Sequence, residues 1–427
     1  MKTTNYISAL ILAGLSLAVQ AQTDTILQKQ VEELVQQNLT LSEQLNALKP
    51  GKSKFRLTGF ADFAYHQDLE ETEISRFAHA GFAPIMIWRP SEKLFFESEL
   101  HIELEGGTHG GETGAGHGGH GHGGSEDGGI SHAGKTHFDL GYASFGYFVN
   151  DWLSLVGGKF LSPFGTFNER FHPSWINRLP SVPLGFGHGG AGPTDELGIQ
   201  ARGGLQLGKT KLYYALYLSN GPVLEDGKGD ADRAGTLLFS NFEDNNVNKA
   251  IGGRIGWLPF SNSSLEIGLS GQYAGKTGDR GTDYENVSAF LYAADLTYVK
   301  DFAPLAGTIR LTGQYSAADV GDAYYLNDSM DIAMGEDSLY TFANFSSFYY
   351  VQLAWRLDKL QSKVLSKVEL VVRYDEASMA PKSKWAFADS RITVGLNYWI
   401  HARSALKAEV RIGELNTIAM LQWTMGF

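Results

Sequence analysis

The stretch FRLTGFADFAYH, residues 55–66, alternates apolar and polar side chains with a period of two. This period is typical of a β-strand with one apolar and one polar face, whereas a helix repeats every 3.6 residues. The same alternation returns many times along the chain in stretches of about ten residues, which is the length of a membrane-spanning strand. Turn-forming residues separate the stretches, and counting between the turns predicts sixteen strands.

The connections between these strands alternate in length. Short polar turns such as 208–210 and 401–403 contrast with long Gly/Asp/Asn-rich connections such as 220–248 and 318–342. Short turns at one end and long loops at the other are typical of outer-membrane barrels, which have an even number of strands in bacteria. The sequence therefore predicts an all-β fold, a 16-stranded antiparallel transmembrane β-barrel over residues 51–427. A soluble double-sheet protein is the structural alternative.

The segment LQWTMGF, residues 421–427, places Leu421, Trp423, Met425 and Phe427 on one face. A last strand that ends in Phe resembles the recognition signal of outer-membrane barrels for their insertion machinery. We therefore expect outer-membrane lipid and the barrel insertion machinery to be partners of the chain. An ordinary amphipathic edge strand is the alternative interpretation.

Residues 1–21 are expected to be a secretory signal peptide. Lys2 gives a positive start, residues 7–19 are apolar, and Ala21 stands at the expected cleavage position. A membrane anchor is disfavoured because the apolar run is too short to span a bilayer. The predicted location is the outer membrane of a Gram-negative bacterium.

Residues 22–50 are predicted to be a periplasmic coiled-coil helix, because apolar residues recur there at alternating spacings of four and three. Asn38 is the one polar member, and such a residue usually fixes register or oligomer number. A lone helix of this length is marginal in water, so we expect self-association, as a homotrimer. A single helix packed on the following domain is the alternative. The seam consists of Leu27, Val31, Leu34, Asn38, Leu41, Leu45 and Leu48.

The composition restricts the partners. The chain contains no cysteine, so it has neither disulfides nor thiolate metal ligands. Its formal net charge of −12 argues against nucleic acid as a partner.

In a porin-like barrel the polar face of each strand points into the lumen. On this basis Asp62 and a ladder of acids on the third strand are predicted to line the pore. The ladder consists of four carboxylates and one histidine: Glu97, Glu99, His101, Glu103 and Glu105. The next strand is expected to place His137 and Asp139 inside and Tyr142 outside, toward lipid.

Basic residues dominate the predicted inner face of the later strands. Opposed acidic and basic walls would create a transverse field in a water-filled pore. The alternative interpretation is that these charges solvate the lumen and pair with one another. The basic residues are Arg202, Arg254, Arg310, Arg356, Arg373, Arg391, Lys407 and Arg411.

The connection 162–195 is long, aromatic and rich in proline. Long loops in compact proteins are usually functional, and here we expect the loop to fold inward as a constriction loop. Its candidate lining groups are Glu169, Arg170, His172 and Arg178. An outer cap that stabilises the trimer is the alternative.

The predicted extracellular loop 106–136 is rich in histidine and glycine. Imidazole binds Zn²⁺, Ni²⁺ and Cu²⁺, so this loop and its flanks could capture a metal ion. Glycine-rich spacing does not preorganise such ligands, and a solvated low-complexity loop is the alternative. The candidate ligands are His101, His109, His117, His120, His122, His132 and His137.

The stretch LSLVGGKFLSPFGTFNERFHPSWINRLPSVPL, residues 153–184, resembles porins of the phosphate-selective porin O and P group. That resemblance implies a signal peptide, an N-terminal coiled coil and a trimer of sixteen-stranded barrels. The acidic charge and the acidic third strand depart from the group's phosphate-binding pattern, so its phosphate-binding residues are not carried over.

These features predict an outer-membrane porin that allows passive diffusion of small polar or charged solutes or ions and requires no cofactor. A metal-gathering porin that captures Zn²⁺ on the histidine-rich loop and aids its uptake is the alternative. A barrel enzyme or an adhesin is less favoured, because no nucleophile and base stand in a recognisable arrangement.

Overall fold

A computed structural model describes residues 54–70, 75–105, 135–187, 190–239, 241–327, 329–335, 337–414 and 416–427. The chain divides into two compact units, Met1–Phe55 and Arg56–Phe427. The expected signal peptide and coiled coil, and most of the histidine-rich loop, lie outside the described residues.

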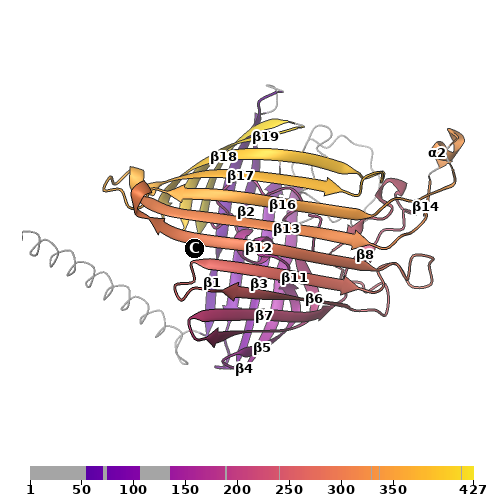
Figure 1. Cartoon of the computed structure of the whole chain (residues 1–427), viewed down its shortest axis with the longest axis horizontal. Coiled ribbons are helices and arrows are strands. Elements are labelled where there is room, and N and C mark those ends of the chain that lie inside the picture. The colour runs from indigo at the N-terminus through magenta and orange to yellow at the C-terminus, as the bar shows by residue number, and fades with distance from the viewer. Residues whose placement is uncertain are drawn as a thin grey trace, which may run out of the picture. The chain divides into compact units, whose positions relative to one another are not determined.

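Sixteen strands of the described chain form one closed antiparallel barrel (Figure 1). Each strand pairs with the next barrel strand in the sequence, and the first pairs with the last, from Phe60 opposite Gly426 to Asp68 opposite Ile418. The predicted sixteen-stranded barrel is confirmed. The strands are β1 (Phe55–Asp68), β2 (Ser75–Trp88), β3 (Leu94–Glu105), β4 (Lys135–Asn150), β5 (Leu153–Leu161), β6 (Asp195–Leu207), β7 (Thr210–Ser219), β10 (Ala250–Leu258), β11 (Leu265–Ala274), β12 (Ala289–Phe302), β13 (Gly307–Val320), β16 (Phe345–Arg356), β17 (Val368–Met379), β18 (Phe387–His401), β19 (Ser404–Gly413) and β20 (Thr417–Gly426).

The smaller elements lie in the connections between barrel strands. Two pairs of short strands form separate two-stranded sheets, and the helices among the described residues are short, of three to five residues. None of the helices in the described part of the chain is long and apolar enough to cross a bilayer. These elements are β8 (Val223–Leu224) with β9 (Leu237–Leu238), β14 (Tyr325–Leu326) with β15 (Leu339–Tyr340), α2 (Ser329–Ala333), a π-helical turn (Phe167–Phe171) and 3₁₀ turns (Ala231–Arg233, Ala303–Leu305, Leu365–Lys367).

The outward face of the barrel is apolar. Ile255 on β10 is 62% exposed and Leu269 on β11 is 64% exposed, whereas Arg254, one residue before Ile255, is buried on the inward face. Exposed tryptophans stand beside the short turns, at positions 88, 152 and 257. Apolar side chains thus cover the outside with an aromatic residue at several strand ends, as in lipid-facing barrels.

A bulge in β4 corrects the predicted orientation of Tyr142. Tyr142 pairs with Glu99 of β3, but the next pair is Leu140 with Leu100, so Gly141 is an extra residue. An inserted residue reverses the faces to which the later residues of the same strand point. Tyr142 therefore shares the inward face with Glu99, contrary to the prediction that it faces lipid.

The hydrophobic core of the barrel lies between its inner wall and the connection from β5 to β6. Phe186 of this connection packs edge-on against Phe348 and Tyr350 of β16, with ring centroids 5.0 and 5.1 Å apart. Leu179 is fully buried against Ala354 and Val371. Apolar groups on the inner wall thus give the connection a surface on which to pack.

Candidate functional site

Residues 162–194 connect β5 to β6, and we call them the inserted segment. Contacts of its described residues, 162–187 and 190–194, place it on the inner face of the barrel. Gly165 donates its backbone N–H to Ser270 Oγ of β11 at 3.0 Å. Thr166 and Phe167 both donate to Gln314 Oε1 of β13, at 2.8 and 3.0 Å. Because Ser270 and Gln314 point inward, these bonds hold the start of the segment inside the barrel, and the predicted alternative of an outer cap does not fit this placement.

Glycine allows the segment to approach the wall closely. Gly165 has a φ of +68°, and a Cβ on it would lie 1.9 Å from Gln314 Nε2. Gly185 has a φ of +76°, and a Cβ there would lie 2.8 Å from the ring of Phe348. A side chain at either position would both strain the backbone and collide with the wall.

Arg373 of β17 anchors the middle of the segment. Its guanidinium donates to the backbone oxygen of Ser181 at 2.9 Å and to the Ser181 hydroxyl at 2.7 Å, and it pairs with Asp375 at 2.8 Å. Arg373 is 0% exposed. The prediction that Arg373 lines an open lumen therefore needs correction: it points inward, but the segment covers it.

Two other predicted basic residues are also covered. Arg254 is buried and lies 2.7 Å from Asp295 of β12 and 2.7 Å from the Tyr213 hydroxyl. Lys407 is buried and donates to the backbone oxygen of Asn177 at 2.7 Å. Both cations bind partners within the protein, and Arg254 also borders a cavity beside the segment.

The remaining basic residues lie mostly beside inward acids or aromatic rings. Arg391 pairs with Asp389 at 2.8 Å, and Arg356 lies over the ring of Trp399 at 5.1 Å. Arg310 and Arg411 are half-buried on the inward parity of β13 and β19. The late strands also carry inward acids that were not predicted, such as Asp295, Asp375 and Asp389. Their presence favours pairing of the charges with one another over two opposed charged walls.

Charged groups of both signs line a cavity of about 300 Å³ beside the segment. Arg202 of β6 lies 2.7 Å from Glu169, and Arg170 lies 2.8 Å from Glu266 of β11. The side chain of Arg202 is 42% exposed and that of Arg170 is 35% exposed. Both side chains are therefore partly accessible to solvent. Arg178, by contrast, lies 3.7 Å from Glu369 and over Trp399, against the wall.

The acids of the early strands point inward. Glu97 accepts a hydrogen bond from Ser144 at 3.5 Å. Asp62 lies 3.2 Å from His79 and accepts a bond from Gln422 at 3.0 Å. Glu105 ends β3, and its side chain is outside the described set.

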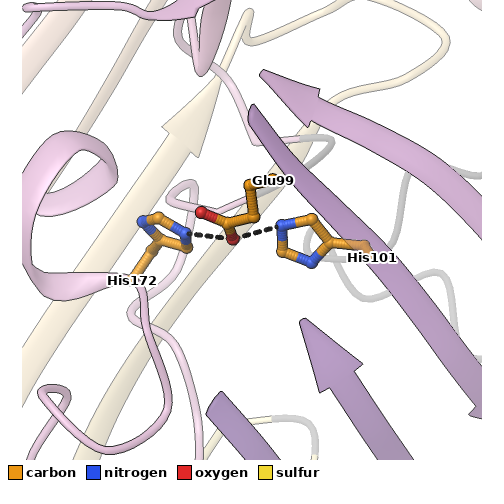
Figure 2. A group of neighbouring side chains, drawn as sticks. All are labelled: Glu99, His101 and His172. Carbon is orange, nitrogen blue, oxygen red and sulfur yellow. Dashed lines mark ion pairs between the residues drawn. The ribbon is translucent and has the colours of Figure 1, made fainter. Parts of the chain in front are cut away.

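Glu99 and His101 of β3 meet His172 of the inserted segment (Figure 2). From the sequence, Glu99 and His101 share the inner face of the third strand and His172 belongs to the constriction loop, with nothing to connect His172 to the other two. His172 lies more than seventy residues after them, which gives no local pattern, so only the inward path of the segment reveals the cluster.

Of the other predicted metal ligands, His137 alone lies within the described residues. His137 pairs with Glu103 across β3 and β4 and is exposed. The remaining candidates lie outside the described residues, so the structure offers no support for a metal-gathering loop. They are His109, His117, His120, His122 and His132.

Comparisons with known proteins show the fold. No family model and no curated protein matches the chain. The outer membrane channel DcaP of Acinetobacter baumannii aligns with a TM-score of 0.50 at 11% identity, over 87% of this chain and 97% of that one. Salmonella typhi OmpF, in complex with daunomycin, aligns with a TM-score of 0.52 at 11% identity, over 87% and 97%. Neither is named as a phosphate-selective porin, so the resemblance of residues 153–184 to that group is supported for the barrel fold only.

Proposed function

We propose that this chain is an outer-membrane porin that lets small polar or charged solutes diffuse passively through a barrel narrowed by the inserted segment. The observation that carries the proposal is the path of that segment. It runs along the inner wall, and buried side chains of the wall, such as Gln314 and Arg373, bind its backbone. A segment tied to the wall in this way narrows the lumen without moving aside as each solute passes.

The outer surface supports a membrane location. Side chains such as Ile255 and Leu269 would expose a large apolar surface to water, whereas lipid accommodates them. In a closed barrel the backbone N–H and C=O groups of every strand form hydrogen bonds with neighbouring strands, so they do not need water as a partner. Two of the solved structures with a similar fold are named as an outer membrane channel and as OmpF, which agrees with the outer membrane of a Gram-negative bacterium as the location.

The solute class follows from the groups around the cavity. Glu169, Arg170 and Arg202 present both signs of charge close to one another. Mixed charge favours hydrated polar or ionic solutes over lipophilic ones. Nothing in this arrangement requires a cofactor or a chemical step.

The N-terminal expectations belong to the same proposal. Residues 1–21 would direct export, and the heptad seam of residues 22–50 would hold three chains together. The strand that ends at Phe427 would be read by the insertion machinery.

Planar-bilayer recording of the purified, folded full chain tests the proposed function. We expect stepwise conductance, of equal size in repeated insertions. Folded protein that inserts into the bilayer but passes no current would refute the porin assignment.

A further inference from the structure

Three side chains that can ligate a metal ion converge between the barrel wall and the inserted segment (Figure 2). Glu99 Oε1 lies 2.7 Å from His101 Nε2 and 3.7 Å from His172 Nε2. All three ligand atoms lie within 4.8 Å of one another. For tetrahedral coordination with bonds of about 2.1 Å, ligand atoms stand about 3.4 Å apart. The observed separations bracket that value, so small side-chain movements would admit an ion.

The second ring nitrogen of each imidazole also faces an oxygen. His172 Nδ1 lies 2.6 Å from the backbone oxygen of Asn168, and His101 Nδ1 lies 3.7 Å from Glu103 Oε1. Histidines that bind metals usually donate their other N–H to a carbonyl or carboxylate, which fixes the tautomer and the ring orientation. The arrangement around Glu99 has this second layer on both sides.

The tautomer of His172 favours a cation at this place. A carbonyl oxygen only accepts, so His172 Nδ1 carries the hydrogen that points at Asn168. In the neutral ring, Nε2 then presents a lone pair toward the carboxylate of Glu99, 3.7 Å away. Two electron-rich atoms in this arrangement attract a cation that can bind both.

The surroundings strengthen such binding. Glu99 is 2% exposed and His101 is 9% exposed. The ring of Phe60 lies edge-on to both imidazoles, at 6.1 Å from His101 and 6.4 Å from His172. Electrostatic attraction is stronger where water is excluded, and a buried carboxylate requires a compensating cation.

We propose that Glu99, His101 and His172 form a binding site for one divalent transition-metal ion, of the Zn²⁺, Co²⁺, Ni²⁺ or Cu²⁺ class that imidazole and carboxylate ligate. Two ligands come from β3 and one from the inserted segment, so the ion would fasten the segment to the wall. The proposal goes beyond the porin assignment and does not depend on current through the barrel. It also differs from capture by the histidine-rich loop, because the three proposed ligands include no histidine of that loop.

The test uses Co²⁺ and Zn²⁺ with the untagged full chain. The histidines at positions 109, 117, 120, 122 and 132 are first replaced by serine, which removes competing ligands in the loop. Because the chain has no cysteine, visible absorption of bound Co²⁺ would report nitrogen and oxygen ligands alone. We expect about one Co²⁺ per chain, displaced by Zn²⁺.

In that background, Glu99→Gln and His172→Ala should each weaken Co²⁺ binding by at least about tenfold. His401→Ala, at the exposed end of β18, is the matched control and should leave binding unchanged. No stoichiometric Co²⁺ in the serine background would overturn the proposal, because that protein keeps the whole cluster intact. Equal binding by Glu99→Gln, His172→Ala and His401→Ala would also overturn it. The cation between Glu99 and His172 would then be a proton.

Discussion

Arg373 of β17 donates two hydrogen bonds to Ser181, which lies 192 residues earlier in the chain and belongs to the inserted segment. Both bonds are shorter than 3.0 Å and both residues are buried. The wall of the barrel therefore holds the segment through a charged group that water does not reach.

Replacing Arg373 by alanine should loosen the segment. Asp375 would lose its cation and Ser181 two donors, and breaking a buried ion pair typically costs about 3–5 kcal/mol. We expect larger single-channel conductance and more open-channel noise. Arg280→Ala, in an exposed loop, is the matched control. Unchanged conductance and noise in Arg373→Ala would show that Arg373 does not position the segment.

Gln314→Met should release the start of the segment. Two buried N–H groups, of Thr166 and Phe167, would lose their acceptor, at about 1–3 kcal/mol each. We expect trypsin to cleave after Arg170 faster than in the unaltered protein, as measured by mass spectrometry. Gln206→Met replaces an exposed glutamine and should not change the rate. Equal cleavage of both variants would contradict the anchoring role of Gln314.

The charges beside the cavity should set ion preference in opposite directions. Glu169→Gln removes a negative group, so the reversal potential in a KCl gradient should move toward anion selectivity. Arg202→Gln removes the positive charge that is paired with Glu169, so it should move the reversal potential toward cation selectivity. Shifts of the same sign, or none, would mean that ions do not pass this pair.

Gly141→Ala should disturb the cluster of Glu99, His101 and His172. A Cβ on Gly141 would lie 2.8 Å from His101 Cδ2, whereas on Gly157 it would have no atom nearer than 3.9 Å. Overpacking of this kind costs about 1–3 kcal/mol and would displace the imidazole. We expect weaker Co²⁺ binding in Gly141→Ala than in Gly157→Ala. The same affinity in both would show that the position of His101 is unimportant for binding.

The sequence predicted the barrel well because its signal is repeated. Alternation like that of residues 55–66 recurs along the barrel strands, so one irregular strand has little effect on the predicted number of strands. The alternation also assigned Glu97, Glu99 and Asp62 to the inner face, where the structure places them.

Local patterns could not predict the bulge or the contacts across the lumen. One extra residue at Gly141 reverses the faces of Tyr142 and the residues after it, and no motif marks it. The pairing of Arg254 with Asp295 depends on the register of β10, β11 and β12, and the meeting of His172 with Glu99 depends on the path of the inserted segment. Sequence spacing contains neither.

The central claim is that the inserted segment narrows a conducting lumen. The chain has no cysteine, so Glu169→Cys gives one reactive thiol beside the cavity. Glu243→Cys, in an exposed loop, is its matched control. During bilayer recording, a charged methanethiosulfonate reagent should lower the current of Glu169→Cys channels and leave Glu243→Cys channels unchanged. If mass spectrometry shows that the thiol of the Glu169→Cys variant is fully modified and the current is unchanged, the account is contradicted.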